Sequence, residues 1–552
     1  MRAALAHLFL AFGAFKLASQ PVLAQEDADP PEVVIRERLF LETRFAQFFF
    51  ANSHGNANAT LAAGDPVMNH QVTTDAPMPG PFARKSMNCR ACHLVDEFGA
   101  TAGAGNRTYA DFARRSPVPA REDGRVTTPR NSPSLVNATL PKRKTLLLHF
   151  DGEFDSTVDL VKGTFTGRNF GWLPGEQKQA IVHIAHIIRG DNGKDSLAQD
   201  TGGLSYLVLL TGVAPSIPEE LVLPDKFRVN VYTASDDQIF DAVARLVAAY
   251  VDSLRFSQDD DGAFNSSPFD VFLKKNNLPR RPAKRETNLE YARRLRTLVE
   301  ALPNPKFVTP ADGRFQFHDQ PFVFGTNELA GLKIFLREPS ELPPTAAEIS
   351  AGGIGNCLAC HAPPDFTDFR FHNTGVAQAE YDSIHGQGAF SALEIPALKQ
   401  RAANFDAYLP PTARHPNARG PFLSVPSADD PALTDLGLWN VFANPDQKKS
   451  QAKIRRALVA TFGKLPTDQM LDKAIGLFKT PGLRDLADSA PYFHTGQFDT
   501  LDSVVGFYRG IGNATRAGAV RNADPQLVGV ALNSEDLDAL AAFLKSLTED
   551  YS

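Results

Sequence analysis

The chain has 552 residues, of which 43% are hydrophobic and 22% charged, and its formal net charge is −6. This length suffices for two or three domains, and the composition is ordinary for a globular protein. Nucleic-acid binding usually requires a basic face, so the slightly acidic balance argues against a nucleic-acid partner.

The first 24 residues are typical of an export signal. Arg2 supplies the positive start, an apolar run extends from Ala3 to Phe15, and Val22-Leu23-Ala24 fits a small-residue cleavage site. A membrane anchor is the alternative, but the run is well short of the ~20 apolar residues that span a bilayer. We therefore expect residues 1–24 to be removed and the mature protein to be periplasmic, with no membrane span.

All four cysteines lie in Cys-x-x-Cys-His strings, Cys89-Arg-Ala-Cys92-His93 and Cys357-Leu-Ala-Cys360-His361. This spacing is that of c-type haem attachment, in which each thiol forms a thioether with a haem vinyl and the His supplies the proximal iron ligand. Two disulfides, a redox dithiol or a zinc site are the alternatives, but none of them requires a His directly after each pair. The strings therefore predict two covalently bound haem c groups.

Periodicity predicts mainly helices joined by long loops. In chain order, helices are expected around 32–49, 176–189, 236–254, 286–302, 327–336, as a pair within 451–478, and over 534–547 with Ser534 as its cap. Residues 51–80, 99–145 and 256–285 are expected to be mostly loop, because they are rich in turn-forming or polar residues. Asp259-Asp260-Asp261-Gly262 lacks the alternating spacing of a calcium loop, so we expect a solvated loop there.

Two long stretches resemble the bacterial dihaem cytochrome c peroxidase and MauG superfamily. One runs from Cys360 to Val376, and the other runs from Lys479 to Tyr508 through Ser489-Ala-Pro491-Tyr-Phe-His494. Arg130 to Ala138 is similar to the same family's segment between its haems. The resemblance covers most of residues 85–250 and 325–550.

The resemblance implies a mainly α fold with two cytochrome c-like haem domains, long loops and insertions near 275–322 and 400–475 that are atypical of the family. We assign residues 25–230 to an N-terminal, peroxidatic haem domain and residues 231–552 to a C-terminal, electron-transfer haem domain. The last helix, 534–548, is expected to pack back on the N-terminal domain.

The resemblance also implies ligands beyond the two strings. None of the five methionines falls where many family peroxidases have a second ligand to the C-terminal haem iron, whereas Tyr508 does, as in MauG-type enzymes. No His lies between His93 and His149, so the N-terminal iron is expected to be open and five-coordinate. A calcium ion between the domains would be bound by the Asn131 side chain and the carbonyls of Ser489 and Pro491; a turn role is the alternative for Asn131.

The chain departs from the family pattern in two places. Phe150 occupies the position of a Trp that relays electrons between the haems, so another aromatic residue, Trp172 or Trp439, or direct tunnelling would have to serve. In the distal pocket, the family's catalytic Gln and Glu are replaced. The candidate pocket residues are Leu160 at the Gln position and Arg168, Asn169 and Phe170 around the Glu position.

Three histidines outside the two strings have specific expectations. His183 and His186 lie one helical turn apart and could bind a metal, but the isoleucines around them favour packing. His372 matches a family residue near the second haem, where a structural hydrogen bond is expected.

The sequence therefore predicts a peroxidase-type oxidoreductase that reduces hydrogen peroxide at the N-terminal haem. A small cytochrome c or a cupredoxin is the expected electron donor. Loss of a positioned acid/base group typically costs about 10²–10⁴ in rate. A second hypothesis therefore remains, that of a MauG-like or rubber-oxygenase-like enzyme. Such an enzyme would oxidise a protein residue or an organic substrate, with peroxide or dioxygen as oxidant. A non-catalytic electron carrier is the third possibility.

Overall fold

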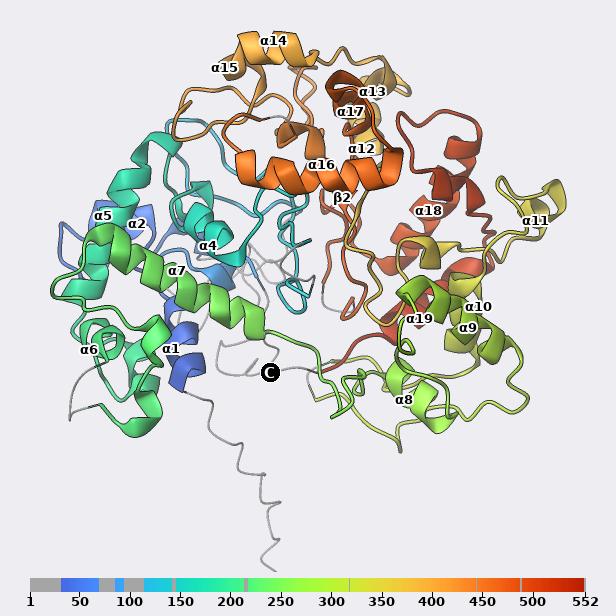
Figure 1. Cartoon of the computed structure of the whole chain (residues 1–552), viewed down its shortest axis with the longest axis horizontal. Coiled ribbons are helices and arrows are strands. Elements are labelled where there is room, and N and C mark those ends of the chain that lie inside the picture. Colours follow the sequence, from blue (N-terminus) through green and yellow to red (C-terminus); the bar gives the residue numbers. More distant parts are fainter. Residues whose placement is uncertain are drawn as a thin grey trace, which may run out of the picture.

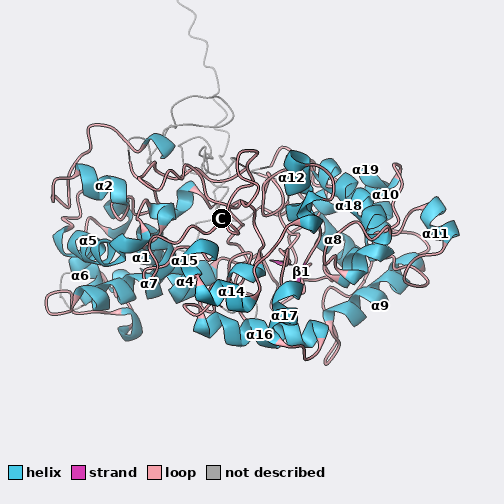
Figure 2. Ribbon diagram, turned by 90° about the horizontal axis from the view of Figure 1, so that it is seen from above, coloured by secondary structure: helices cyan, strands magenta, loops and turns pink. Residues whose placement is uncertain are grey.

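The computed structural model describes residues 31–68, 85–93, 114–140, 145–212, 217–316, 318–442, 444–486 and 489–550. Helices joined by long loops make up this part of the chain, which confirms the predicted mainly α class (Figure 2). Its one sheet pairs β1 (Phe371–His372) antiparallel with β2 (Phe478–Lys479). None of the described helices combines the length and apolarity needed to cross a bilayer. The predicted export signal, residues 1–24, lies outside the described residues.

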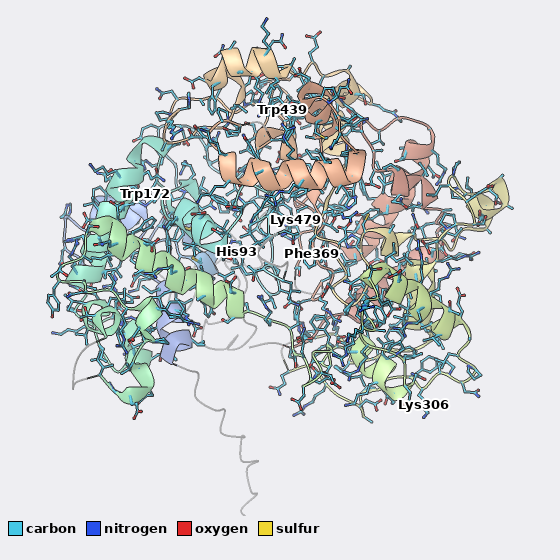
Figure 3. The ribbon with its side chains drawn as sticks, in the orientation of Figure 1. His93, Trp172, Lys306, Phe369, Trp439 and Lys479 are labelled. Carbon is cyan, nitrogen blue, oxygen red and sulfur yellow. The ribbon has the colours of Figure 1, made fainter. Side chains whose placement is uncertain are left out.

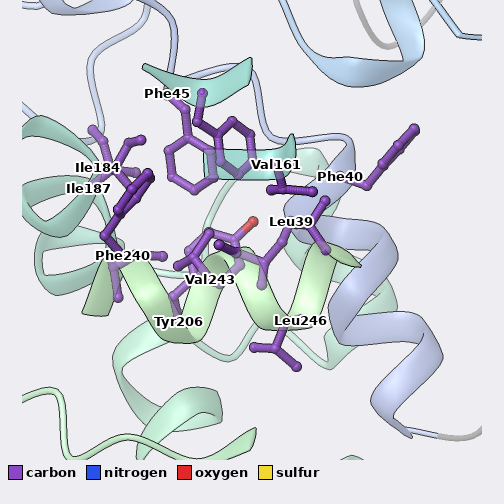
Figure 4. Packing of buried hydrophobic residues seen from close by; sticks show 14 of the residues in the cluster. Leu39, Phe40, Phe45, Val161, Ile184, Ile187, Tyr206, Phe240, Val243 and Leu246 are labelled. Atoms are coloured by element: carbon purple, nitrogen blue, oxygen red, sulfur yellow. The ribbon is translucent and has the colours of Figure 1, made fainter. Parts of the chain in front are cut away.

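The first group of helices packs around one apolar core on the left of Figure 1. Its members are α1 (Pro31–Phe40), α2 (Gln47–Asn52), α4 (Thr157–Phe165), α5 (Gln177–Gly190), α6 (Tyr206–Thr211) and α7 (Asp236–Ser253). Helix α7 begins with a capping box between Ser235 and Gln238, and its buried stripe includes Phe240, Val243 and Leu246, which Figure 4 shows packed with residues of α1 and α5.

Two predictions for this half were wrong. The domain boundary after residue 230 lies too early, because α7 packs on α1, α4 and α5 and completes their core. The single helix expected over 32–49 is two helices. Between them, the buried Glu42 carboxylate accepts hydrogen bonds from the Arg44 backbone and guanidinium, and Arg44 also pairs with Asp191. These polar contacts hold a turn at residues 41–46.

The second group of helices lies on the right of Figure 1 and has its own core. It comprises α8 (Pro268–Lys275), α9 (Asn288–Glu300), α10 (Thr326–Leu336), α11 (Ala346–Ala351), α18 (Leu501–Arg516) and α19 (Asp536–Lys545). Helix α8 falls where a loop was expected. It is only eight residues long, but Ser267 and Asp270 form a capping box at its start, and Phe269 and Phe272 are fully buried.

The predicted packing of the last helix was also wrong. Helix α19 packs on α10 and α18 within the C-terminal half, not on the N-terminal domain. The two helices approach closely because α10 has Gly331 opposite Ala539, where a Cβ would collide with the Ala539 carbonyl. The N-cap is Glu535 rather than Ser534, and its side chain makes no capping hydrogen bond. Just before it, the Asn533 Oδ1 accepts hydrogen bonds from the backbone N–H groups of Glu535 and Asp536, at 2.8 and 3.2 Å.

A third core is formed largely by the predicted insertion at 400–475. It includes α12 (Val376–His385), α13 (Ala389–Ala392), α14 (Leu398–Ala403), α15 (Phe405–Tyr408), α16 (Lys448–Phe462) and α17 (Thr467–Lys473). In Figure 1 this group, in yellow to orange, lies above the other two, with α16 crossing between them. The insertion therefore bridges the two halves.

Short 3-10 turns complete the described secondary structure. They are η1 (Pro66–Met68), η2 (Cys89–Ala91), η3 (Arg168–Phe170), η4 (Pro174–Glu176), η5 (Ser196–Thr201), η6 (Glu219–Leu221), η7 (Asp225–Phe227), η8 (Cys357–Ala359), η9 (Leu438–Asn440) and η10 (Pro525–Gly529). Two of them, η2 and η8, are formed by the first three residues of the Cys-x-x-Cys-His strings.

Candidate haem sites

The two Cys-x-x-Cys-His strings fold into the same local structure. In each string, the backbone N–H of the His donates to the carbonyl of the first Cys, at 3.0 Å for His93 and 2.8 Å for His361. Each string also follows an asparagine, a repeat that the sequence analysis missed. The Asn88 Oδ1 accepts from the Ala91 N–H and so caps the first turn, whereas the Asn356 amide donates to the Gln526 carbonyl.

The two imidazoles are oriented alike. The Nδ1 of His93 lies 2.8 Å from the Pro133 carbonyl, and the Nδ1 of His361 lies 2.8 Å from the Phe366 carbonyl. A metal-ligating His commonly donates one ring N–H to such an acceptor, which fixes the ring and leaves the other nitrogen for the metal. The residues present therefore fit a haem at each string, with each Nε2 available to iron.

Burial keeps both imidazoles in the neutral form that binds metals. It lowers the pKa of His93 to about 4 and also lowers the pKa of His361. All four cysteines are free thiols in the structure, so no disulfide joins them. Burial raises the pKa of Cys89 and Cys357, which keeps these thiols protonated.

Tyr508 lies in α18, close to the second string. Burial raises the pKa of its phenol, and the neighbouring thiols of Cys360 and Cys357 add to this effect. Its place beside these thiols is compatible with a second ligand to the C-terminal haem iron, and its ligation stays a prediction.

Phe150 lies at the contact between the two halves. Its ring is 6.2 Å from that of His494, and its carbonyl accepts from the Lys479 N–H at 2.7 Å. The His494 ring stacks on Phe478 with ring centroids 3.5 Å apart, and burial lowers the pKa of His494 to about 3. Phe150, His494 and Phe478 thus form an aromatic row between segments far apart in sequence.

The two tryptophans lie away from this contact. Trp172 is buried in the first core, where its Nε1–H donates to the Phe45 carbonyl. Trp439 is buried in the third core, under the Arg401 guanidinium at 4.0 Å from its ring centre. In Figure 3 both are distant from the middle of the molecule, where His93 and Phe369 are labelled. This placement argues against either Trp as a relay between the haems.

Of the candidate distal residues, Leu160 lies in α4 and the other three, Arg168 to Phe170, lie in η3. Arg168 and Phe170 have structural partners. The Arg168 guanidinium donates to Asp123 at 2.8 Å and to the Pro119 carbonyl at 2.9 Å, which holds it against the 119–125 loop. Phe170 is buried against Phe165, and Asn169 is half-buried. No carboxylate occurs from Arg168 to Phe170.

The candidate calcium ligands converge only in part. The Asn131 Nδ2 donates to the Pro491 carbonyl at 2.5 Å, while its Oδ1 accepts from the Ser132 N–H at 2.9 Å. The Ser489 hydroxyl donates to the Asp485 carbonyl. As oriented, the amide presents its NH₂ group to Pro491, so the site would fit calcium only with the amide turned over. The calcium site stays a prediction.

The other histidines have structural partners, as expected. The Nε2 of His183 lies 2.7 Å from the Arg44 carbonyl, and the Nε2 of His186 lies 3.0 Å from the Gly55 carbonyl, so the two do not form a metal pair. His372 lies between two carboxylates, 2.6 Å from Asp524 and 2.9 Å from Asp368. Burial opposes its protonation, but these two hydrogen bonds raise its pKa to about 12.

Comparison with known proteins identifies relatives. No family model matches the chain. It is 28% identical over 198 residues to cytochrome-c peroxidase IdrP2 of Denitromonas iodatirespirans, covering 36% of this chain and 37% of the relative. It is 39% identical over 79 residues to cytochrome-c peroxidase IdrP2 of Pseudomonas sp. (strain SCT), covering 14% of this chain and 19% of the relative. It is 40% identical over 74 residues to cytochrome c peroxidase Ccp of Escherichia coli (strain K12), covering 13% of each chain. Parts of the chain are therefore similar to bacterial cytochrome-c peroxidases.

The matched part spans less than two fifths of the length of these relatives. Two solved structures match the chain at low sequence identity. The diheme peroxidase BthA from Burkholderia thailandensis E264 matches at 16% identity with a TM-score of 0.42, covering 94% of this chain and 86% of the other. A MauG-like protein associated with microbial copper homeostasis matches at 14% identity with a TM-score of 0.40, covering 97% and 96%.

Proposed function

We propose that the chain is an exported, peroxidase-type oxidoreductase with two c-type haems, joined by thioethers to Cys89 and Cys92 and to Cys357 and Cys360. One observation carries this proposal: each Cys-x-x-Cys-His string forms the same turn, with the imidazole Nδ1 held by a carbonyl and the Nε2 left for iron. Residues 1–24 support export to the periplasm, where haem c is attached.

The surroundings of the two strings support different roles. Tyr508 beside the second string would give the C-terminal haem a hard anionic ligand, which suits a haem that holds or passes oxidising equivalents. The sequence places no His between His93 and His149, which supports an N-terminal iron open to peroxide. Hydrogen peroxide would thus react at the N-terminal haem, with electrons delivered through the C-terminal haem.

The haem irons, when bound, supply the one-electron redox chemistry of the reaction. Overall, one hydrogen peroxide takes up two electrons and two protons and gives two waters, and a small cytochrome c or cupredoxin gives up the two electrons. The chain's own residues orient the two iron-binding imidazoles and pack the contact between the halves. Pro133 and Phe366 fix the two imidazoles, while Phe150 and His494 fill the contact between the halves.

A second function is favoured by one specific observation. The segment from Arg168 to Phe170 contains no carboxylate, Phe170 is buried and apolar, and Arg168 is held by Asp123. Without a positioned acid, cleavage of the peroxide O–O bond is slow. This favours a MauG-like or rubber-oxygenase-like enzyme that oxidises a protein residue or an organic substrate.

Steady-state turnover of hydrogen peroxide by the holoprotein, with a reduced small cytochrome c as donor, tests the proposal. A peroxidase is expected to reach a kcat/KM of about 10⁴–10⁸ M⁻¹s⁻¹. A value orders of magnitude lower with both haems intact would contradict peroxidase activity. Dioxygen uptake or substrate oxidation would then indicate the oxygenase-type function, and the absence of both would indicate an electron carrier.

A further inference from the structure

The acceptor for the His361 imidazole is an unusual residue. Phe366 has a φ of +51°, in the left-handed region that a bulky side chain rarely adopts, and its side chain is fully buried. Such a conformation persists only where the surrounding structure enforces it. Whatever anchors Phe366 therefore also sets the position of the carbonyl that accepts from His361.

Helix α8 provides part of that anchor through two successive side chains. The Phe269 ring packs edge-on against the Phe366 ring, with centroids 5.6 Å apart. Asp270 forms a two-point ion pair with Arg484, at 2.9 and 3.1 Å, and both side chains are almost fully buried. Phe269 contacts the loop from His361 to Phe366 directly, and Asp270 acts on it through Arg484.

Arg484 connects this ion pair to the same loop. Its Nε donates to the Pro364 carbonyl at 3.2 Å, and its guanidinium lies 5.6 Å from the centre of the Phe366 ring. Helix α9 adds a further contact, since the Asn288 amide donates to Asp365 at 3.0 Å. The loop from His361 to Phe366 is therefore held by two helices that precede the second haem string in sequence.

We propose that Phe269 and Asp270 of α8 are positioning residues for the C-terminal haem, which set its midpoint potential by fixing the hydrogen bond between His361 and Phe366. This inference rests on the proposed function in one respect, the attachment of a haem at Cys357 and Cys360. An imidazole that donates firmly to a carbonyl is a more basic ligand and favours the oxidised iron. Loosening that hydrogen bond therefore raises the midpoint potential.

The test is a spectroelectrochemical titration of the holoprotein, with each haem assigned from His93→Gly and His361→Gly proteins. Asp270→Asn is expected to raise the C-terminal midpoint potential, because it weakens the pair with Arg484 and removes a negative charge. Phe269→Leu is expected to raise it as well, through packing alone. Asp312→Asn is the matched control, since Asp312 pairs with Lys275 at the exposed end of α8. It is expected to shift neither haem.

The proposal is overturned if the C-terminal potential in Phe269→Leu equals that of the wild type, or if both haems shift by the same amount. Phe269→Leu decides the matter if Asp270→Asn fails to fold, because Asp270 also caps α8. A protein with no haem at Cys357 and Cys360 would instead contradict the proposed function. The two failures are therefore distinguishable, and neither depends on peroxide turnover.

Discussion

The Nδ1 of His93 lies 2.8 Å from the carbonyl oxygen of Pro133, and the segment just before Pro133 is bound to the C-terminal half of the chain. The Asn131 N–H donates to the His494 carbonyl at 2.7 Å. The Arg130 guanidinium pairs with Asp435 of the insertion at 2.5 Å and with Asp151 at 2.7 Å. The hydrogen bond that orients the N-terminal imidazole is therefore built on the contact between the two halves.

Removal of the Arg130 charge is expected to destabilise the protein strongly. Arg130→Gln leaves the carboxylates of Asp151 and Asp435, each at most 3% exposed, without their shared cation. Breaking a buried ion pair in this way costs about 3–5 kcal/mol in the free energy of unfolding. Urea denaturation measures it. Arg293→Gln, which breaks an exposed pair with Glu338, is the control and is expected to cost at most about 1 kcal/mol. Equal losses in the two variants would contradict the role of Arg130.

Substitution of Tyr508 tests its assignment as an iron ligand. Tyr508→Phe removes the phenol oxygen, so the absorption spectrum of the C-terminal haem is expected to change while that of the N-terminal haem stays the same. Tyr381→Phe is the control, because the Tyr381 hydroxyl donates to the Pro431 carbonyl in the third core. An unaltered spectrum in Tyr508→Phe would remove Tyr508 as a ligand.

A tryptophan at position 150 is expected to speed electron transfer between the haems. Phe150 lies in the contact with His494, and an indole is much easier to oxidise than a phenyl ring. We expect electron transfer between the haems of the Phe150→Trp protein to be faster by at least about tenfold, which is equivalent to lowering the barrier by about 1.4 kcal/mol. Stopped-flow reduction of the C-terminal haem, followed at the N-terminal haem, measures the rate. With Phe150→Leu as the control, equal rates in all three proteins would place Phe150 off the route.

His183 is expected to make the protein sensitive to acid. Burial lowers its pKa to about 4, whereas in the unfolded chain the pKa is about 6.5. The unfolded state therefore binds the proton first as the pH falls. The stability due to neutral His183 is present above about pH 6.5 and lost between about pH 6.5 and 4.

The difference between a pKa of about 6.5 in the unfolded chain and about 4 in the folded protein corresponds to a full loss of about 3 kcal/mol in the free energy of unfolding. His183→Gln is expected to lose less stability than the wild type between pH 7 and pH 4.5. Urea denaturation at both pH values measures the difference. Parallel losses in the two proteins would show that His183 is not the group that titrates.

The sequence predicts local structure well where one short pattern suffices. The apolar stripe of α7 and the five-residue haem strings needed no knowledge of distant residues, and the structure confirms the helix and gives both strings the same turn. The resemblance to bacterial cytochrome-c peroxidases likewise rests on motifs around Cys360 and Pro491. These features depend on the order of neighbouring residues in the chain.

The remaining features depend on contacts that sequence order does not reveal. Arg130 and Asp435 are 305 residues apart, and nothing in either segment indicates the pair. Pro133 and Phe366 accept from the imidazoles through backbone carbonyls, which carry no signature of residue type. The close approach of α19 to α10 requires a glycine, Gly331, in the facing helix. Tertiary packing decided each of these.

The central claim is that each Cys-x-x-Cys-His string carries one covalent haem. The intact mass of the exported protein measures this directly, together with Cys89→Ala/Cys92→Ala and Cys357→Ala/Cys360→Ala proteins. The account predicts a wild-type mass equal to the mature chain plus two haems, and one haem fewer in each double variant. A wild-type mass without haem, or haem that acid acetone extracts from the protein, would contradict it.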